Sequence, residues 1–232
     1  MNNIYGIILA GGSGSRMKAS KPKQFLKLRN CTLLEHSVKK FNSWGFFKSI
    51  VIVSNPEYLI DTENCIGKYL NQFDRIVPGG ETRHDSSIAG LEAIPYDDKD
   101  VIIFHDCARP FILNSELHST ANSAMMYGVS SLAEPISDTI VSSFDSKIDK
   151  ILDRESIYLI KTPQAVIGSI LKNLLTSQIN SNPTDLTSWA KSIGVDAHLT
   201  KSNPFNMKIT KEGDLEIAEK FYDLFKILDE SK

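Results

Sequence analysis

The sequence predicts an α/β fold built around a mostly parallel sheet. Apolar runs alternate with segments of helical periodicity, and the runs at 4–10, 49–54 and 101–106 are apolar at nearly every position. Such runs are typical of strands buried on both faces, and the intervening helices supply the crossovers that parallel strands need. With 232 residues, the chain is long enough for one large domain, which we expect to span 1–232.

Each element follows from its own pattern. We expect strands at 4–10, 49–54, 75–80, 101–106 and 129–135, and helices at 32–44, 56–72, 85–94 and 114–128. Asn114 or Ser115, and Thr184 or Asp185, suit helix N-caps because their side chains accept hydrogen bonds from free backbone N–H groups. An amphipathic helix over 212–228 closes the chain.

The segment 138–161 breaks this alternation. Two β-rich runs flank the turn at Asp145-Ser146-Lys147 with no helix between them, which predicts a hairpin. An isolated two-stranded hairpin is marginal in water, so we expect this β-arm to pack on something else, such as another subunit.

Composition limits the partners. Charged residues make up 23% and hydrophobic residues 41%, and the net charge is −2, which leaves no positive excess for a general nucleic-acid or membrane surface. No apolar stretch approaches the roughly 18 residues of a membrane span, and no signal peptide is visible. Cys31, Cys65 and Cys107 lack metal-binding spacing, so we expect reduced thiols in a cytoplasmic protein.

A glycine-rich loop follows the first strand and is the strongest functional signal. Gly11, Gly12 and Gly14 place no Cβ between the backbone N–H groups and an anion, and the cations Arg16 and Lys23 come soon after. Clustered cations are unfavourable unless a strongly negative group lies among them. The pattern predicts a phosphate-binding site at the carboxyl end of this strand, and a nucleoside triphosphate fits it.

Three glycine-loop chemistries compete for this segment. A P-loop is excluded because no Gly-Lys pair follows. The dinucleotide-binding fingerprint would put Met17 where a small residue is needed, and it would need an acidic residue where Val53-Ser54-Asn55 closes the second strand. A nucleotidyltransferase loop, with glycines around a triphosphate and cations downstream, fits best. The alternative without a ligand is a tight turn beside a solvated basic patch.

A second glycine turn, Gly79-Gly80, leads into a predicted helix. The free N–H groups of that helix start could hold an anion or read a base edge, while Asp85 or Ser86 would cap the helix. On pattern alone, a ligand role for the glycines and a purely structural role are equally consistent.

Two further polar groups lie where ligands bind in such sheets, beyond the strand ends. Asp106 and Arg109 follow the most apolar strand; they suit contacts with a hydroxyl, a metal or a phosphate, or a salt bridge with each other. Lys208 lies among alternating apolar residues and suits either a site cation or a surface residue.

Ten short sequence blocks, taken together in their order along the chain, resemble the cytidylyltransferase family that activates polyol phosphates. The resemblance covers nearly the whole chain, through LAGGSGSRM, KPKQF, LLEHSV, GGETRHDS, HDCARP, PISDTI, LDR, KTPQ, PTD and NMKIT. It implies a Rossmann-like nucleotidyltransferase domain with a mostly parallel sheet and a protruding β-arm at about 138–161. It also implies CTP and a polyol phosphate as substrates, Mg²⁺ as cofactor, and a homodimer whose arm crosses the twofold axis.

The resemblance further implies roles for individual residues. Arg16, Lys23 and Lys208 would be the catalytic cations. The nucleotide would be bound by Leu9, Ala10, Gly11, Gly12, Ser13, Gly14, Gly79, Gly80, Arg83, Ser86 and Asp106. The acceptor would be bound by Arg109, Thr139, Arg154, Thr162, Thr184 and Asp185. Thr139 and Arg154 would reach across the dimer, and no protein ligand to the metal is assigned.

The chemistry is consistent with a cation-rich site. A phosphomonoester has a second pKa of about 6, so its oxygen is largely deprotonated at pH 7 and needs no general base. Attack on the α-phosphorus of CTP does need two anions brought together and charge stabilised as pyrophosphate departs. Magnesium would bridge phosphate oxygens with few protein ligands.

One four-residue run and three single positions indicate the acceptor. The run at 9–12 is Leu-Ala-Gly-Gly where the methylerythritol branch usually has Pro-Ala-Ala-Gly, Leu186 replaces its usual Glu, and Phe111 and Val141 also resemble the ribitol branch. The sequence therefore favours D-ribitol 5-phosphate, giving CDP-ribitol, over 2-C-methyl-D-erythritol 4-phosphate of isoprenoid synthesis. A nicotinamide-dependent oxidoreductase is disfavoured by Met17, and a silent binding protein by the presence of both Arg16 and Lys23.

Overall fold

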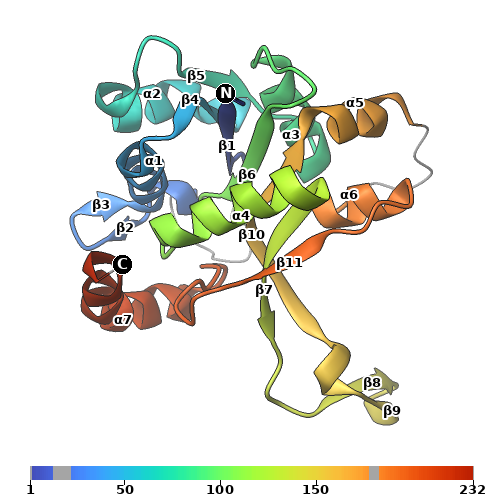
Figure 1. Ribbon diagram of the computed structural model, residues 1–232. Coiled ribbons are helices and arrows are strands. Elements are labelled where there is room, and N and C mark those ends of the chain that lie inside the picture. Colours follow the sequence, from blue (N-terminus) through green and yellow to red (C-terminus); the bar gives the residue numbers. More distant parts are fainter. Residues whose placement is uncertain (1, 13–21, 178–182, 232) are drawn as a thin grey trace.

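A seven-stranded sheet forms the centre of the computed structural model, which describes residues 2–12, 22–177 and 183–231 (Figure 1). The strands lie in the order β11-β7-β10-β6-β1-β4-β5. Their bounds are β1 (Ile4–Ala10), β4 (Phe47–Ser54), β5 (Arg75–Pro78), β6 (Val101–Asp106), β7 (Val129–Pro135), β10 (Tyr158–Ile167) and β11 (His198–Lys201). Only β10 runs antiparallel to its neighbours in this sheet. The predicted mostly parallel sheet is confirmed.

Helices cover both faces of the sheet. One face carries α1 (Leu33–Trp44), α2 (Leu59–Ile66) and α4 (Asn114–Tyr127), and the other carries α3 (Arg83–Glu92), α5 (Gly168–Thr176) and α6 (Leu186–Ser192). In β4, Ile50 and Ile52 join the first core, whereas Val51 and Val53 join the second. Because successive side chains enter opposite cores, these strands are apolar at every position rather than at alternate ones.

A smaller core fixes the C-terminal part of the chain beside the sheet edge. The predicted amphipathic helix is present as α7 (Glu212–Glu230), next to the short strands β2 (Lys27–Leu28) and β3 (Cys31–Thr32). Phe225 of α7 packs on Phe111 with ring centroids 5.0 Å apart, and the Ile209 N–H donates to the Ala108 carbonyl at 2.9 Å. This core therefore holds the extended segment 206–210, which includes Lys208, against the loop after β6.

The β-arm extends from the ends of β7 and β10, away from the helices (Figure 1). Its hairpin consists of β8 (Ile140–Phe144) and β9 (Lys147–Leu152), joined through Asp145 and Ser146 with φ of 50° and 59°. The hairpin predicted at 138–161 extends too far at its C-terminal end. Residues 158–161 begin β10 and pair with 132–135 of β7 in the main sheet. A 3-10 turn at Arg154–Ser156 separates β9 from β10. The apolar pattern of the sequence alone does not indicate where one strand ends and the next begins.

Helix starts differ from the predicted caps in two cases. The N-cap of α3 is Thr82, with Asp85 at the third helical position completing a capping box, so neither Asp85 nor the serine after it is the cap. The N-cap of α4 is Leu113, whose N–H donates to the Glu116 carboxylate at 2.8 Å. For α6, Asp185 is the N-cap as predicted, accepting from the Ser188 N–H at 2.8 Å.

Short 3-10 helices and three cysteines complete the description of the fold. Further 3-10 helices lie at Lys23–Phe25, Pro56–Tyr58 and Gly67–Tyr69. Cys31, Cys65 and Cys107 are free thiols. Within the three described ranges, no helix has the length and apolar character that crossing a membrane requires.

Candidate active site

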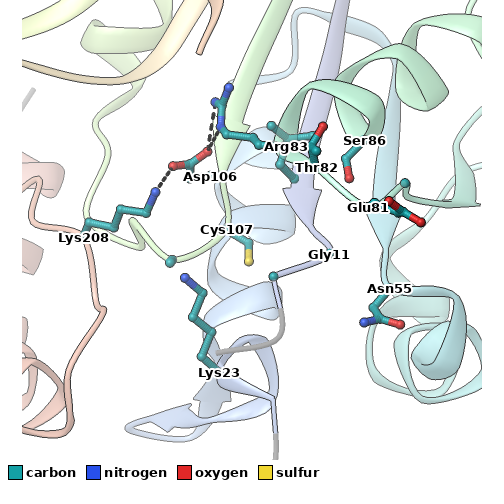
Figure 2. Close-up of a pocket in the computed structure, with 14 residues that line it drawn as sticks. Gly11, Lys23, Asn55, Glu81, Thr82, Arg83, Ser86, Asp106, Cys107 and Lys208 are labelled. Atoms are coloured by element: carbon teal, nitrogen blue, oxygen red, sulfur yellow. Dashed lines mark hydrogen bonds and ion pairs between the residues drawn. The ribbon is translucent and has the colours of Figure 1, made fainter. Parts of the chain in front are cut away.

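A cleft of about 450 Å³ opens at the carboxyl ends of β1, β4 and β6 (Figure 2). Parallel strands end together at this edge of the sheet, so loops far apart in sequence meet there. The cleft is lined by Leu9, Gly11, Gly12, Lys23, Asn55, Gly80, Glu81, Thr82, Arg83, Ser86, Asp106, Cys107, Ala108 and Lys208. We call it the first pocket.

Both glycine turns bring backbone close to their neighbours. A Cβ on Gly12 would lie 3.6 Å from Lys23 Cε and 3.9 Å from its Nζ, so the first turn lies directly beside this lysine. A Cβ on Gly79 would lie 2.8 Å from Ser86 Oγ, and one on Gly80 would lie 2.3 Å from the Cβ of Asp85. The second turn therefore packs tightly on the start of α3, which forms one wall of the first pocket.

Asp106 holds two cations at the centre of the site. Arg83 donates to Oδ1 through Nε at 3.1 Å and Nη2 at 3.0 Å, and Lys208 Nζ donates to Oδ2 at 2.6 Å. Figure 2 shows the two cations reaching the carboxylate from different sides. Burial by itself would raise the pKa of Asp106, but the charges of Arg83 and Lys208 outweigh burial and hold it well below its usual value. The carboxylate is therefore ionised at neutral pH.

A second pocket of about 190 Å³ adjoins this cluster. It shares Arg83, Asp106 and Lys208 with the first pocket. Its other lining residues are Arg109, Ile160, Lys161, Thr162, Gln164, Thr184 and Asp185. Two adjacent pockets that meet at a cluster of one anion and two cations suit a reaction that joins two anionic substrates.

A buried network supports Asp106 from behind. His105 Nε2 lies 3.1 Å from the Arg109 carbonyl, and its Nδ1 lies 3.2 Å from Thr162 Oγ1, which also accepts from the Asp106 N–H at 3.1 Å. A carbonyl only accepts, so Nε2 carries the proton and Nδ1 accepts from the Thr162 hydroxyl. Burial lowers the pKa of His105 to about 4, and the ring is therefore a neutral structural link between β6 and β10.

Two of the expected acceptor residues are strongly engaged within the protein. Arg109 Nη1 donates to the Asn206 carbonyl at 3.1 Å; burial lowers its pKa, and the carboxylates of Asp106 and Glu134 oppose that shift. The expected alternative of a simple Asp106–Arg109 salt bridge is not what forms, since Asp106 pairs with Arg83 and Lys208. Asp185 caps α6 and accepts from Gln164 Nε2 at 2.8 Å.

Several predicted residues lie elsewhere. Ser13, Gly14 and Arg16 fall outside the described residues. Thr139 precedes β8 and Arg154 follows β9, and neither lines the two pockets. Arg154 Nη1 donates to the Ser137 carbonyl at 2.8 Å, and its side chain is 52% exposed.

Of the other residues expected to bind the nucleotide, Leu9, Gly11, Gly12, Gly80, Arg83, Ser86 and Asp106 line the first pocket. Ala10 is buried at the end of β1, and Gly79 stands next to the pocket residue Gly80. Pocket residues that the sequence did not reveal include Asn55, Thr82, Lys161 and Gln164. Asn55 directly follows β4, so its place at a strand end was a usable signal.

The described residues contain no group of three or more His, Cys, Asp and Glu side chains that could hold a metal ion. Asp106 and Glu81 are the acidic residues that line the first pocket, and both oxygens of Asp106 already accept from cations. The donor set therefore fits a divalent cation only where phosphate oxygens supply most of its ligands.

Comparison with known proteins identifies close relatives. A profile of the family described as IspD, 2-C-methyl-D-erythritol 4-phosphate cytidylyltransferase, matches residues 4–223. The enzyme of that name from Leptospira borgpetersenii is 45% identical over 225 residues, covering 97% of this chain and 96% of the relative. The one from Leptospira interrogans is 46% identical over 222 residues, covering 96% and 93%.

Solved structures show the same fold. The 4-diphosphocytidyl-2C-methyl-D-erythritol synthase of Anaerococcus prevotii superimposes with a TM-score of 0.79 at 23% identity, covering 96% of each chain. The 2-C-methyl-D-erythritol 4-phosphate cytidylyltransferase of Francisella tularensis gives 0.77 at 26% identity, covering 94% of this chain and 99% of that one. The expected nucleotidyltransferase fold is confirmed.

These relatives contradict the expected preference for ribitol 5-phosphate, because they carry the name of the methylerythritol enzyme. The structure explains why the sequence positions misled. Phe111 and Leu186 are core residues, 1% and 2% exposed, and Leu9 lines the first pocket and not the second. Val141 lies on the β-arm, in β8. Core side chains vary with local packing, so they are poor indicators of the acceptor.

Proposed function

Because the chain belongs to the 2-C-methyl-D-erythritol 4-phosphate cytidylyltransferase family, it is a CTP-dependent nucleotidyltransferase, and we propose that its acceptor is 2-C-methyl-D-erythritol 4-phosphate. The product would be 4-diphosphocytidyl-2C-methyl-D-erythritol, a precursor in isoprenoid synthesis. Identity of 45% across 97% of the chain carries this proposal. The two adjoining pockets support it, since each substrate needs its own place.

In the proposed reaction, an oxygen of the acceptor phosphate attacks the α-phosphorus of CTP. A new P–O bond forms there, the bond between the α-phosphorus and its bridging oxygen breaks, and pyrophosphate leaves with the electron pair. The attacking oxygen is already ionised near pH 7. The protein therefore contributes position and positive charge rather than a general base.

The first pocket would take CTP. Gly11, Gly12 and Gly80 offer close backbone approach, and Lys23, together with Arg16 from the family resemblance, would neutralise the triphosphate. The second pocket would take the acceptor, with its phosphate near Arg109 and its other groups near Thr162 and Thr184. Arg83 and Lys208, held by Asp106, would lie at the junction and stabilise charge that develops in the transition state.

Mg²⁺ is the cofactor we propose. When bound, it neutralises the triphosphate and orients it, and the phosphate oxygens would supply most of its ligands. Asp106 already accepts from Arg83 and Lys208 through its two oxygens, so phosphate oxygens rather than this carboxylate would hold the ion.

We also propose a homodimer in which the β-arm reaches the partner's acceptor pocket. Within one chain, Thr139 and Arg154 do not line either pocket. The arm also exposes large apolar side chains: Phe144 is 82% exposed, Ile148 69% and Ile151 73%. Such a surface is typical of an interface, and a twofold axis would place each arm on its neighbour.

Pyrophosphate release tests the nucleotide half of this proposal. The tight backbone loops at Gly11-Gly12 and Gly79-Gly80 leave little space, which favours the smaller pyrimidine ring. With 2-C-methyl-D-erythritol 4-phosphate as acceptor, CTP should exceed ATP and GTP by at least ~10²-fold in kcat/KM, about 2.7 kcal/mol. Comparable turnover with ATP would overturn the cytidylyl assignment.

A further inference from the structure

Lys161 is a buried cation in the acceptor pocket that none of the steps above uses. It belongs to β10, its side chain is 8% exposed, and it lines the second pocket beside Thr162. Its Nζ forms an ion pair at 2.5 Å with Oε2 of Glu134 on the neighbouring strand β7. Within the described part of the chain, Glu134 is the only acidic partner recorded for this lysine.

Strand pairing does not require this ion pair. Residues 158–161 of β10 already form a backbone ladder with 132–135 of β7. Removing an ammonium from water costs several kcal/mol, and a well-packed apolar pair often holds two elements as well or better. The cost falls mainly on the lysine, because the Glu134 side chain is 36% exposed and keeps water contact. A buried ammonium with an exposed partner indicates a function in the pocket.

The ammonium has capacity for another anion. An ammonium carries three N–H donors, and one carboxylate oxygen occupies at most part of that capacity. The other positive charges around the pocket are partly neutralised. Arg83 and Lys208 both pair with Asp106. The Glu134 carboxylate interacts electrostatically with Arg109 as well as with Lys161. A phosphomonoester brings a charge of about −1.5 to −2 near neutral pH, so the pocket gains from one more cation.

We propose that Lys161 is an acceptor-binding residue whose ammonium contacts the phosphate of the polyol phosphate, and that Glu134 holds this ammonium at the pocket wall before the acceptor arrives. The inference rests on the proposed function, since it takes the second pocket as the acceptor site. It adds a cation from the chain's own β10 to those expected from Arg109 and from the partner's arm.

Steady-state kinetics of Lys161→Met tests this assignment. Loss of a charge-assisted contact should raise the KM for the acceptor at least ~10-fold, while the KM for CTP stays within about twofold of the wild type. Lys40→Met is the matched control: Lys40 pairs with Asp229 at 2.6 Å, its side chain is 11% exposed, and it joins α1 to α7 away from both pockets. This control should leave both KM values unchanged.

Two more variants separate binding from a structural role. Lys161→Arg keeps the positive charge and should recover most of the affinity for the acceptor. Glu134→Gln removes the carboxylate but keeps the ammonium, so its acceptor KM should change far less than that of Lys161→Met. An equal rise in both would show that the ion pair itself shapes the pocket and would overturn the inference.

The acceptor's identity is tested separately with the wild type. If the wild-type enzyme turns over another polyol phosphate instead, the proposed acceptor is wrong. A raised KM for that other compound in Lys161→Met would still support the role of Lys161. A folded Lys161→Met enzyme with unchanged acceptor KM overturns that role and leaves the acceptor untouched. A wild type that uses no polyol phosphate overturns both.

Discussion

Lys23 reaches the first pocket from the 3-10 helix Lys23–Phe25, beside Gly12. If it stabilises the triphosphate as pyrophosphate departs, Lys23→Ala should lower kcat by ~10²-fold or more, with an unchanged circular dichroism spectrum. Lys27→Ala, an exposed neighbour in β2, is the matched control and should retain wild-type kcat. A near-wild-type kcat for Lys23→Ala would mean that this cation does not stabilise the transition state.

His105 gives the site a pH dependence of stability. Its pKa falls from 6.5 to about 4 on folding, so the unfolded chain binds the proton more readily and stability is lost as the pH falls through this window. Between pH 6.5 and pH 5 this amounts to about 1.5 kcal/mol. Urea denaturation at both pH values should therefore show a smaller loss for His105→Gln than for the wild type. Equal losses would contradict the buried neutral ring.

The sequence predicted single site residues better than their pairings. Asp106, Arg109 and the glycine turns could be found because they follow apolar strands. The pairing of Asp106 with Arg83 and Lys208 could not be predicted, since these two residues are 23 and 102 positions away and meet it only through the sheet. Lys161 was missed for a related reason: it was placed at the end of the expected hairpin rather than in the main sheet, and its partner Glu134 is on another strand.

At the scale of elements, the β-arm is the part for which we propose a role beyond one chain. If it works in trans, an Arg154→Ala chain mixed with a Lys23→Ala chain forms heterodimers in which one site has both residues intact. Random mixing should then restore about a quarter of wild-type activity, since half of the dimers carry one complete site of two. Each variant alone should stay inactive or severely impaired.

A chain carrying both substitutions, mixed with wild type, controls for the exchange of subunits. Absence of rescue in dimers shown to be mixed would place Arg154 in the site of its own chain. The KM pattern of Arg154→Ala is a second check, because a guanidinium that binds the acceptor's phosphate should affect that KM far more than the KM for CTP.

Element types were predictable where the pattern was strong, and boundaries were not. The strands 4–10 and 101–106 and the final helix were recognisable because burial on one face or both imposes their apolar spacing. The start of α3 was missed because Thr82 and Asp85 form a reciprocal capping box, which shifts the helix start ahead of the residue that looked like the cap. Only the start of β10 was anticipated, as the end of the expected hairpin; Pro163 lies inside this strand, and a proline within an apolar run argues against a strand.

At the scale of the whole molecule, the exposed arm predicts self-association. Phe144 is 82% exposed near the tip of the hairpin, so Phe144→Asp should weaken the dimer and shift light-scattering masses toward the monomer at micromolar concentration. Phe73→Asp, which alters a side chain that is 61% exposed outside the arm, should leave the mass unchanged. A wild-type protein that is monomeric and fully active would contradict the arm's proposed role.

The acceptor was the part of the function for which the prediction from the sequence, D-ribitol 5-phosphate, was wrong. Its indicators, such as Phe111 and Leu186, lie in the core, so they follow packing rather than recognition. The residues that do line the second pocket, such as Lys161 and Gln164, come together only in the folded sheet. If this pocket binds the acceptor as proposed, discrimination between two polyol phosphates depends on the shape of the pocket, which local sequence patterns describe poorly.

Competition between acceptors tests the central claim most directly. The enzyme would be given CTP, Mg²⁺ and equal concentrations of 2-C-methyl-D-erythritol 4-phosphate and D-ribitol 5-phosphate, with both CDP-polyol products quantified by mass spectrometry. The proposed function predicts that the methylerythritol product forms at least ~10²-fold faster, a difference of about 2.7 kcal/mol in transition-state binding. Equal or greater formation of CDP-ribitol would contradict it.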